Sequence, residues 1–393
     1  MQVVINILLF CLTLFVLYLW FFAVVYFVKK PTKIPSQNPQ KRFLFLIPAH
    51  NEELLLPGTI KSLKRQNYPQ DLFDLVVIAD HCTDKTTHIA QQEKVNCCEY
   101  KNQENKGKGF ALNWFFENNS LDHYDAVVFV DADTVLDPNF LQVMNDRLLS
   151  GQKIIQAYND IRNYEENPLT RLIYTTSFLK NLSFYEAKER LGLSSALMGV
   201  GMCVDVEILK KIGWKAFSVG EDWEYYAQLI SQGKKVNFAS TTKVYAQEAV
   251  SLKGGFSQRL RWAGGKFEVM GKYGLEMLWK GLKTFDIHKI DASLNILMPN
   301  YSMLLNLNIV CLLLALLFGH SFLIWWSLFL LFLQGFYFSI GLWLGKADKK
   351  MIFSVLIIPI FLLWKGVIDI LSLFGFKRKK WIRTQRVSKE SLT

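Results

Sequence analysis

The uncharged run from residue 3 to residue 28 most constrains what this chain can fold into. It is long enough to cross a lipid bilayer as one helix. No charged segment precedes it and no small-residue cleavage site closes it, which indicates a retained anchor and not a removed signal peptide. Lysine and arginine residues crowd the next segment, 29–42, and such residues mark the cytosolic side of a membrane. The sequence therefore predicts a membrane anchor over residues 1–30 and places the polar middle of the chain in the cytosol.

Three further apolar runs lie near the end of the chain, at 293–318, 321–345 and 351–376. The first two predict a hairpin through the short turn "GHS". We expect membrane segments over residues 291–376 and a basic cytosolic tail over residues 377–393. Together with the anchor, these runs predict an integral membrane protein.

The last of these runs differs from the other two. Basic residues flank both of its ends, Pro359 interrupts its middle, and Lys365 and Asp369 stand one helical turn apart inside it. A charged pair is expensive at the centre of a bilayer, and basic flanks on both sides oppose a simple crossing. The pattern predicts an interfacial or re-entrant helix.

The net charge of +11 raises the question of nucleic acid. Much of the excess lies in "KGKG", "GWK", "KRKK" and the segments beside the apolar runs, where anionic lipid headgroups and phosphorylated substrates are nearer partners. We therefore expect membrane lipids as partners and no nucleic acid. The cysteines show no metal-ligand spacing and no disulfide framework.

From residue 43 short apolar runs alternate with helical patterns, which predicts an α/β domain with a mostly parallel, doubly wound sheet. Three predicted strands end in the polar loops "PAHNEE", "ADHCTD" and "DADT", and we expect these loops to meet at the carboxyl edge of the sheet, where such sheets bind ligands. The predicted strands and helices occupy 42–53, 54–66, 72–84, 85–93, 105–119 and 127–130.

Asp131 and Asp133 follow the last of these strands. Two carboxylates this close repel each other, and a hard divalent cation with oxygen ligands relieves that repulsion. The alternative for each motif is ordinary. The two acids could simply open a turn, Glu52 and Asp80 could cap helices, and Lys108 could lie in a solvated loop.

Two motifs in the second half of the domain carry chemistry. Glu221 and Asp222 precede a helical pattern, where acids also interact with the helix dipole. Gln258, Arg261 and Trp262 share one helical face, and this set suits a diphosphate and a sugar ring because Arg contacts phosphate in a bidentate manner and Trp stacks on apolar ring faces. A basic helix on the membrane surface fits the same segment.

At this point the motifs "PAHNEE", "ADHCTDKT", "KGFALN", "DAD", "GED" and "QRLRW" stand in the order and at the spacing of a known family. The sequence resembles membrane-bound family-two glycosyltransferases with the GT-A fold, which include cellulose, chitin and hyaluronan synthases and many exopolysaccharide enzymes. The resemblance runs from about residue 43 to 386. It implies a GT-A, Rossmann-like catalytic domain over residues 41–255 and interfacial helices with the QxxRW motif over residues 256–290.

The resemblance further implies an inverting sugar transfer from a nucleotide-diphosphate donor, commonly a UDP-sugar, with Mg²⁺ or Mn²⁺ as cofactor. The acceptor would be a glycan or a lipid-linked molecule, and the enzyme would lie in a bacterial plasma membrane. The resemblance implies that Ala49, Glu52 and Asp80 contact the nucleotide, that Lys108 reaches the donor, and that Gln258 and Arg261 hold the diphosphate. Asp131 would lie against ribose or metal, and Asp133 would bind the metal. Asp222 would be the general base, with Glu221 beside it, and Trp262 would lie where acceptor meets donor.

The chain also departs from the family pattern. It has "LMGVGMC" where cellulose synthases carry a cysteine-containing acceptor motif, and it has few apolar segments from which to build a channel. Transfer to a lipid-linked oligosaccharide therefore stands beside polymerisation. A glycolipid-forming enzyme of the ceramide glucosyltransferase type and a non-catalytic membrane scaffold are further alternatives. "WIRTQR" is similar to the gating segment of hyaluronan synthases, which implies that Trp381, Arg383 and Arg386 close over bound nucleotide.

Overall fold

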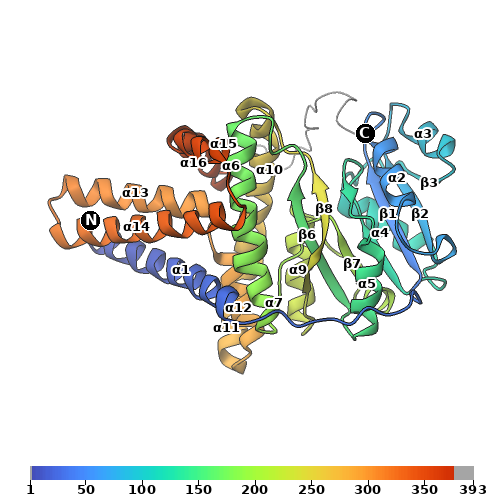
Figure 1. Ribbon diagram of the computed structural model, residues 1–393, viewed down its shortest axis with the longest axis horizontal. Helices are drawn as coiled ribbons and strands as arrows, with labels where there is room; N and C mark the ends of the chain where they lie inside the picture. Colours follow the sequence, from blue (N-terminus) through green and yellow to red (C-terminus); the bar gives the residue numbers. More distant parts are fainter. Residues whose placement is uncertain (1, 376–393) are drawn as a thin grey trace.

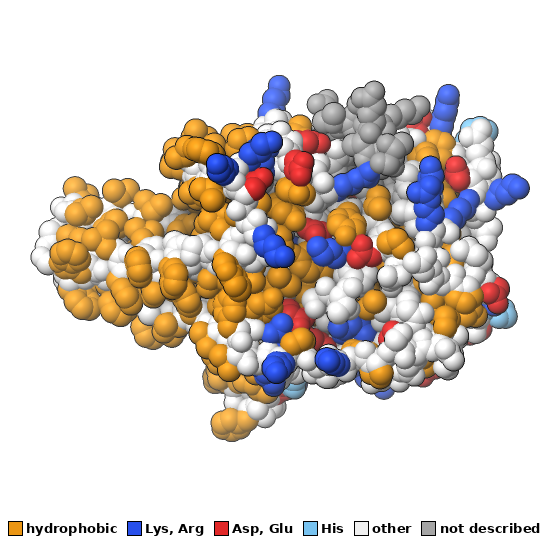
Figure 2. Space-filling view, viewed as in Figure 1, with side chains coloured by type: hydrophobic (Ala, Val, Ile, Leu, Met, Phe, Trp, Pro, Cys, Tyr) orange, Lys and Arg blue, Asp and Glu red, His pale blue; other side chains and the backbone are white. Residues whose placement is uncertain are grey.

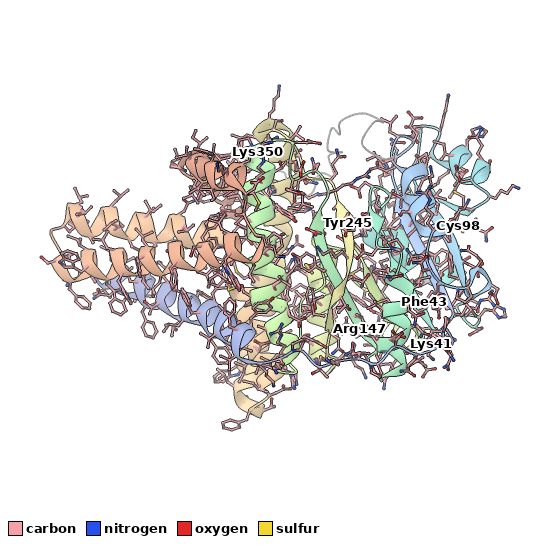
Figure 3. All side chains as sticks on the ribbon, viewed as in Figure 1. Lys41, Phe43, Cys98, Arg147, Tyr245 and Lys350 are labelled. Atoms are coloured by element: carbon pink, nitrogen blue, oxygen red, sulfur yellow. The ribbon has the colours of Figure 1, made fainter. Side chains whose placement is uncertain are left out.

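A computed structural model of the chain describes residues 2–375, and its centre is an eight-stranded sheet (Figure 1). The predicted strand runs form strands because they are rich in branched and aromatic residues that fit a buried sheet. Phe43, labelled in Figure 3, begins β1 and is fully buried opposite Phe73 of β2. In spatial order the strands are β3 (Asn96–Tyr100), β2 (Phe73–Asp80), β1 (Phe43–Ala49), β4 (Ala126–Phe129), β7 (Met202–Asp205), β6 (Ile154–Ile161), β8 (Asn237–Ala246) and β5 (Val135–Leu136).

The sheet has a parallel half and a mixed half. Strands β3, β2, β1 and β4 are parallel, as the alternation of strand and helix predicted. Strand β7 then pairs antiparallel with both β4 and β6, and the two-residue β5 pairs antiparallel with β8. The predicted α/β class is confirmed. The connecting helices are α2 (Leu56–Lys64), α3 (Thr86–Gln92), α4 (Lys108–Asn118), α5 (Phe140–Leu149), α8 (Val206–Ile212) and α9 (Glu221–Ser231), with a short 3-10 turn η1 (Gln70–Leu72).

A long broken helix joins the sheet to the apolar helices. It comprises α6 (Pro168–Phe178), the π-helical segment η2 (Leu179–Glu186) and α7 (Ala187–Arg190). Asn167 caps α6 in a reciprocal capping box with Thr170, and Pro168 occupies the first turn, where its missing N–H costs nothing. Helix α6 contacts β6, η2 contacts β8, and both contact α14 (Ser321–Leu344). This broken helix therefore links the apolar helices to the sheet.

Helices α1 (Gln2–Val28), α13 (Tyr301–Leu317) and α14 lie side by side and project away from the sheet (Figure 1). Figure 2 shows hydrophobic side chains gathered over this projection, while charged side chains are scattered over the rest of the face. Three helices of the described chain are long and apolar enough to cross a membrane, namely α1, α14 and the helix over Lys349–Leu373. The predicted N-terminal helix and the hairpin between α13 and α14 are confirmed.

The sequence predicted that the apolar run at 293–318 forms one helix, and this prediction is wrong. It is divided between α12 (Ile287–Leu297) and α13, which meet at an angle of 67°. Pro299 lies in the break, and a proline both lacks an N–H donor and disfavours helical geometry at the residue before it. Only the second part of the run therefore lies alongside α14.

The last helical stretch comprises α15 (Lys349–Phe353), a 3-10 turn η4 (Ser354–Ile357) and α16 (Ile358–Leu373). Its charged pair, Lys365 and Asp369, is buried and ion-paired. Leu260, Ala263 and Ile368 form a small apolar cluster that packs α16 on α10 (Leu252–Val269), so the pair lies against protein. Lys350, labelled in Figure 3, lies beside α6 at the boundary between the apolar helices and the sheet domain.

Between α10 and the membrane helices, the π-helical turn η3 (Met270–Gly274) leads into α11 (Leu275–Thr284). Exposed Leu275, Trp279 and Leu282 share α11 with Lys280 and Lys283. An exposed apolar stripe bordered by lysines is typical of a helix that lies in a membrane interface. The resemblance implied interfacial helices over residues 256–290, and the placement of α11 in a membrane interface stays a prediction.

Candidate active site

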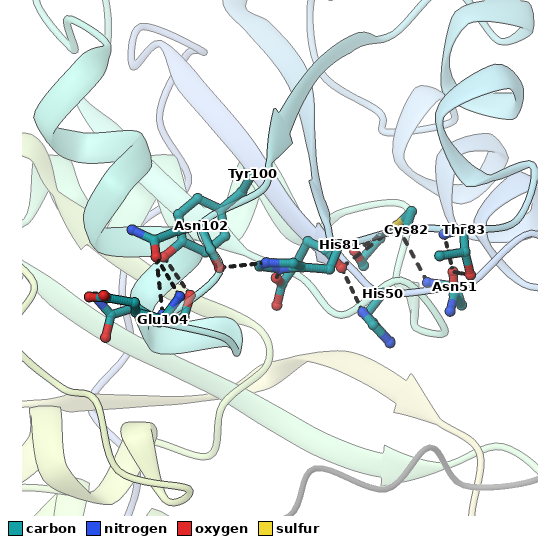
Figure 4. Close-up of polar contacts among 11 residues, drawn as sticks. His50, Asn51, His81, Cys82, Thr83, Tyr100, Asn102 and Glu104 are labelled. Carbon is teal, nitrogen blue, oxygen red and sulfur yellow. Dashed lines mark hydrogen bonds and ion pairs between the residues drawn. The ribbon is translucent and has the colours of Figure 1, made fainter.

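The loops after β1 and β2 are tied to each other at the carboxyl edge of the sheet (Figure 4). The amide oxygen of Asn51 accepts hydrogen bonds from the backbone N–H of Thr83, at 2.7 Å, and of Asp84. The Cys82 thiol donates to the carbonyl oxygen of Ala49 at 3.3 Å. Asn51 has a backbone φ of 56°, which few residues other than glycine tolerate as readily as asparagine. These contacts place Ala49 beside the end of β2.

Asp80 ends β2 and is held by its neighbour. Its Oδ1 lies 2.6 Å from Nδ1 of His81, and Nε2 of His81 lies 2.6 Å from the carbonyl oxygen of Asn102. His81 therefore joins the end of β2 to the loop that follows β3 (Figure 4). Asp80 is nearly buried, and so is Glu52, whose backbone N–H donates to Thr86. Both carboxyl groups border the same cavity, described below.

Lys108 lies at the centre of a group of carboxylates. It begins α4 after Gly107, whose φ of 117° requires glycine. Its Nζ donates to Asp131 Oδ1 and to the carbonyl oxygen of Gly199, both at 2.7 Å, and lies 3.4 Å from Glu221 Oε1. Burial alone would lower the pKa of Lys108, but the carboxylates of Asp131 and Glu221 outweigh it and raise that pKa. Lys108 therefore remains charged and offsets this part of the acidic group.

Asp222 is a buried carboxylate of the site whose pKa is strongly raised. It lies in the first turn of α9, and its Oδ1 accepts a hydrogen bond from the N–H of Trp223 at 2.8 Å. Burial, followed by repulsion from Glu221, raises the pKa of Asp222 to about 7. A carboxylate with a pKa near neutrality is suited to accept a proton during a reaction.

Helix α10 brings the QRLRW segment against the start of α9. Gly220 and Gly265 approach so closely that a Cβ on Gly265 would lie 2.7 Å from the backbone nitrogen of Gly220. Gln258 is buried, and its Oε1 has no hydrogen-bond partner among the described residues. Trp262 is 44% exposed. The close backbone contact fixes the distance between these side chains and Asp222.

One cavity of about 940 Å³ joins these groups. The side chains or backbone of all eleven residues that the sequence singled out in the described part of the chain line it. They are Ala49, Glu52, Asp80, Lys108, Asp131, Asp133, Glu221, Asp222, Gln258, Arg261 and Trp262. The predicted gating residues Trp381, Arg383 and Arg386 lie outside the described residues.

The fit of a divalent cation depends on Asp131 and Asp133. Within residues 2–375 no cluster of three or more His, Cys, Asp or Glu side chains could hold a metal ion on its own. Mg²⁺ is commonly held by one or two carboxylates together with substrate phosphates, which matches this pair. Asp131 Oδ1 accepts a hydrogen bond from Lys108, and Asp133 Oδ1 accepts one from the Thr134 hydroxyl at 3.2 Å. The donor set therefore fits a metal that binds together with a phosphorylated substrate.

Several residues of the cavity were not predicted. Arg259 pairs with Glu248 at 2.8 Å and lies over the Trp262 ring at 5.7 Å. Lys266 donates to the carbonyl oxygen of Met298, and burial, with Lys365 nearby, lowers the pKa of Lys266 to about 8. Arg259 stands inside the QRLRW segment and could have been noticed there.

Lys180 was missed for a different reason. It also lines the cavity, but it stands in the π-helical segment η2, in a stretch without a recognisable motif. The wider winding of a π-helix changes which residues share a face, and no sequence period announced it.

Comparison with known proteins identifies the family. Residues 39–265 match the family model described as "Glycosyltransferase like family 2". The chain is 26% identical over 238 residues to "Probable glycosyltransferase YdaM" of Bacillus subtilis, and 24% identical over 230 residues to a poly-beta-1,6-N-acetyl-D-glucosamine synthase of Staphylococcus aureus. Each match covers 58% of this chain, and the chain spans just over half the length of these relatives, 56% and 55%.

A solved structure extends the likeness to the apolar helices. The mannosyltransferase PcManGT from Pyrobaculum calidifontis, solved in complex with GDP-Man and Mn2+, superposes with a TM-score of 0.60 at 16% sequence identity. The match covers 93% of this chain and 99% of that one, so the two share a fold beyond the sheet domain. Since the family model matches more than half of the chain, the protein belongs to the family-two glycosyltransferases and has the GT-A fold.

Proposed function

We propose that the protein transfers a sugar from a nucleoside diphosphate donor, with a UDP-sugar as the first expectation, to a glycan or lipid-linked acceptor at the membrane. The observation that carries this proposal is the convergence of the Lys108 group, Asp222 and the QRLRW face on one cavity. The synthase relative from Staphylococcus aureus supports a role in building an exopolysaccharide or its precursor.

The proposed step is a single displacement. An acceptor hydroxyl oxygen forms a bond to the anomeric carbon, and the bond from that carbon to the β-phosphate oxygen breaks. The nucleoside diphosphate leaves with the bonding electrons, and the hydroxyl proton passes to the carboxylate of Asp222. The configuration at the anomeric carbon inverts, because the acceptor attacks opposite the leaving group and no covalent enzyme intermediate forms.

The donor would lie between the sheet edge and α10. Ala49, Glu52 and Asp80 line the part of the cavity at the ends of β1 and β2, where the base and ribose would bind. Arg261 and Gln258 would hold the diphosphate from the opposite side, because a guanidinium and an amide can both donate to phosphate oxygens. This arrangement stabilises the charge that develops on the departing diphosphate.

Asp133, with Asp131 beside it, would hold a Mg²⁺ or Mn²⁺ ion that neutralises charge on the diphosphate. The Mn2+ and GDP-Man in the Pyrobaculum structure support this role. Lys108 would keep Asp131 oriented through its 2.7 Å hydrogen bond.

A lipid-linked acceptor is supported by the lining of the cavity. Besides the polar residues, apolar side chains of the α13, α14 and α16 helices line it, among them Leu305, Leu331, Phe338 and Phe361. A glycolipid-forming activity of the ceramide glucosyltransferase type would use the same opening, and it is the second candidate.

The test is a donor screen with the purified chain in detergent and Mg²⁺ or Mn²⁺, measuring release of nucleoside diphosphate for each nucleotide sugar. We expect one donor class to be turned over. Asp222→Asn should reduce turnover by roughly 10²- to 10⁴-fold, the usual contribution of a general base, and leave nucleotide binding nearly unchanged.

Asp133→Ala is the matched comparison. It should weaken metal-dependent binding of UDP, measured by calorimetric titration, because its role is in binding and not in proton transfer. Equal loss of UDP affinity in Asp222→Asn and Asp133→Ala would show that the roles are wrongly assigned, and absence of turnover with every donor would leave the scaffold alternative standing.

A further inference from the structure

The cavity has an apolar branch that five structural elements surround. Helix α6 packs on α14 and on η4, α14 packs on α13, and α13 packs on α16. Side chains of Leu305, Leu331, Phe338, Ile358 and Phe361 line the space between them. Since these elements belong to the apolar part of the chain, a hydrocarbon chain is the chemical group that this branch would accept.

Lys180 lies between the sheet and the apolar helices. It is the second residue of η2, which follows α6 and contacts both β8 and α14, and its exposed side chain borders the cavity. Its neighbours hold the segment on two sides: Asn181 Nδ2 donates to the Asn159 carbonyl oxygen of β6 at 3.0 Å, and the Ser183 hydroxyl lies 3.0 Å from the Tyr337 hydroxyl of α14. The lysine is therefore presented by a fixed backbone.

The acids around Lys180 already have cationic partners. Burial is the largest influence on the pKa of Lys180 and lowers it; among the charged neighbours Glu248 raises that pKa, Arg259 lowers it and Asp160 raises it. Glu248 pairs with Arg259 at 2.8 Å, and Asp160 pairs with Lys243 at 2.8 Å. Lys180 itself makes no hydrogen bond or ion pair with any of the residues that the structure describes. An exposed, unpaired ammonium between an apolar branch and a carbohydrate-transfer site is complementary to an anionic group on an amphiphile.

We propose that Lys180, with Arg259 beside it, binds the phosphate of a lipid-linked acceptor whose hydrocarbon chain occupies the apolar branch and whose sugar reaches Asp222. This inference rests on the proposed function and specifies its acceptor. It adds no chemical step: the acceptor sugar still supplies the hydroxyl, and the phosphate only anchors it. The order along the cavity is donor, Asp222, Lys180, and then the apolar branch.

A binding measurement tests the site independently of turnover. The probe is a fluorescent polyisoprenyl phosphate, titrated with the full chain in detergent and followed by anisotropy, alongside the polyisoprenol that lacks the phosphate. Lys180→Gln should weaken binding of the phosphate probe roughly tenfold or more, because a charge-assisted contact is lost. Binding of the polyisoprenol should change less than twofold, and Lys180→Arg should largely restore binding of the phosphate probe.

The apolar branch has its own variant. Gly335 lines the branch, and a Cβ added there would meet nothing within 4 Å, so Gly335→Leu should fill the branch without disturbing the fold. It should weaken both lipid probes to a similar extent and leave UDP binding unchanged. Lys253→Gln, an exposed lysine of α10 outside the cavity, is the control for loss of one positive charge and should bind like the parent chain.

Three outcomes would overturn the proposal. One is unchanged binding of the phosphate probe by Lys180→Gln. The second is full competition by inorganic phosphate, which would indicate a site for free anions. The third is equal competition by phosphatidylglycerol vesicles, which would indicate a general headgroup site and not an acceptor site. Release of nucleoside diphosphate by transfer to co-purified acceptor or to water, measured in the same preparations without the lipid probe, separates these results from failure of the proposed function.

Discussion

Charge balance at the active site depends on Lys108. Its Nζ contacts Asp131 and lies 3.4 Å from Glu221, so it compensates two of the four carboxylates grouped around the "DAD" and "GED" segments. Burial and the Glu221 carboxylate raise the pKa of Asp222 by more than Lys108 lowers it. The raised pKa of Asp222 is what the proposed role as general base requires near neutral pH.

A pH profile tests this assignment. Because the pKa of Asp222 is raised to about 7 and the base acts in its deprotonated form, kcat/KM should fall about tenfold per pH unit below about 7. Glu221→Gln removes the repulsion that raises this pKa, so the acidic limb should move to lower pH. A limb near pH 4 in the parent chain, or a limb that Glu221→Gln does not shift, would contradict the role of Asp222.

The elements that bring the site together are helices in backbone contact. A Cβ on Gly265 would lie 2.7 Å from the nitrogen and 2.9 Å from the Cα of Gly220, and neither backbone atom can move aside cheaply. Gly265→Ala should therefore push α10 away from α9 and reduce kcat by about tenfold to 100-fold, although alanine is the better helix former. The kinetics should be compared with those of Gly271→Ala, where the added Cβ meets nothing within 4 Å. Equal activity of the two variants would show that the contact does not set the geometry.

A buried ion pair joins the N-terminal helix to the rest of the protein. Lys188 of α7 lies 3.0 Å from Asp291 of α12, and the Tyr18 hydroxyl of α1 donates to the same carboxylate at 2.7 Å. Both charged side chains are almost fully buried. Lys188→Met should lower the thermal unfolding midpoint in detergent, since an uncompensated buried charge costs about 3–5 kcal/mol.

The double variant Lys188→Met with Asp291→Asn should recover most of that loss, because the amide keeps an acceptor for Tyr18 without a charge. Lys280→Met, which breaks an exposed pair with Glu276, should shift the midpoint little. If Lys188→Met shifted the unfolding midpoint no more than Lys280→Met does, the Lys188–Asp291 pair would not stabilise the contact between α7 and α12.

Sequence patterns predicted the elements more completely than their partners. Hydrophobic runs located β1, β2 and β4, and since parallel strands end at one edge, the motifs that follow them meet there. The antiparallel insertion of β7 was not predictable, because the side-chain period of a strand does not encode its neighbour's direction. Pro299 is a helix-breaking signal in the sequence, but the apolar composition of the run on both sides of it favoured the prediction of one continuous helix.

The whole molecule divides into a sheet domain and a projecting set of apolar helices. Helix α14 has 24 residues, which gives a length of about 36 Å and exceeds the roughly 30 Å of a bilayer core. It begins at the turn with α13, far from the sheet, and ends where Gly345 packs on Phe178 of α6 (Figure 1). We therefore predict that one pass through a membrane separates the α13–α14 turn from the sheet domain.

The path of α15 to α16 determines whether the chain crosses the membrane again. The start of this stretch contacts α6, and near its other end the Ser372 hydroxyl lies 3.3 Å from the carbonyl oxygen of Leu260 in the active-site helix α10. Both ends thus contact elements that pack on the sheet domain, although length and composition alone would allow a crossing.

We predict that the stretch from α15 to α16 does not cross the membrane. Single cysteines at His320, Lys350 and Phe374 test this prediction in intact cells treated with a membrane-impermeant maleimide. We expect labelling above that of the parent chain only at His320, and labelling at all three sites after permeabilisation. Labelling of the Phe374 site from outside would mean that α16 spans the bilayer, and labelling of the Lys350 site would place the sheet domain outside the cell.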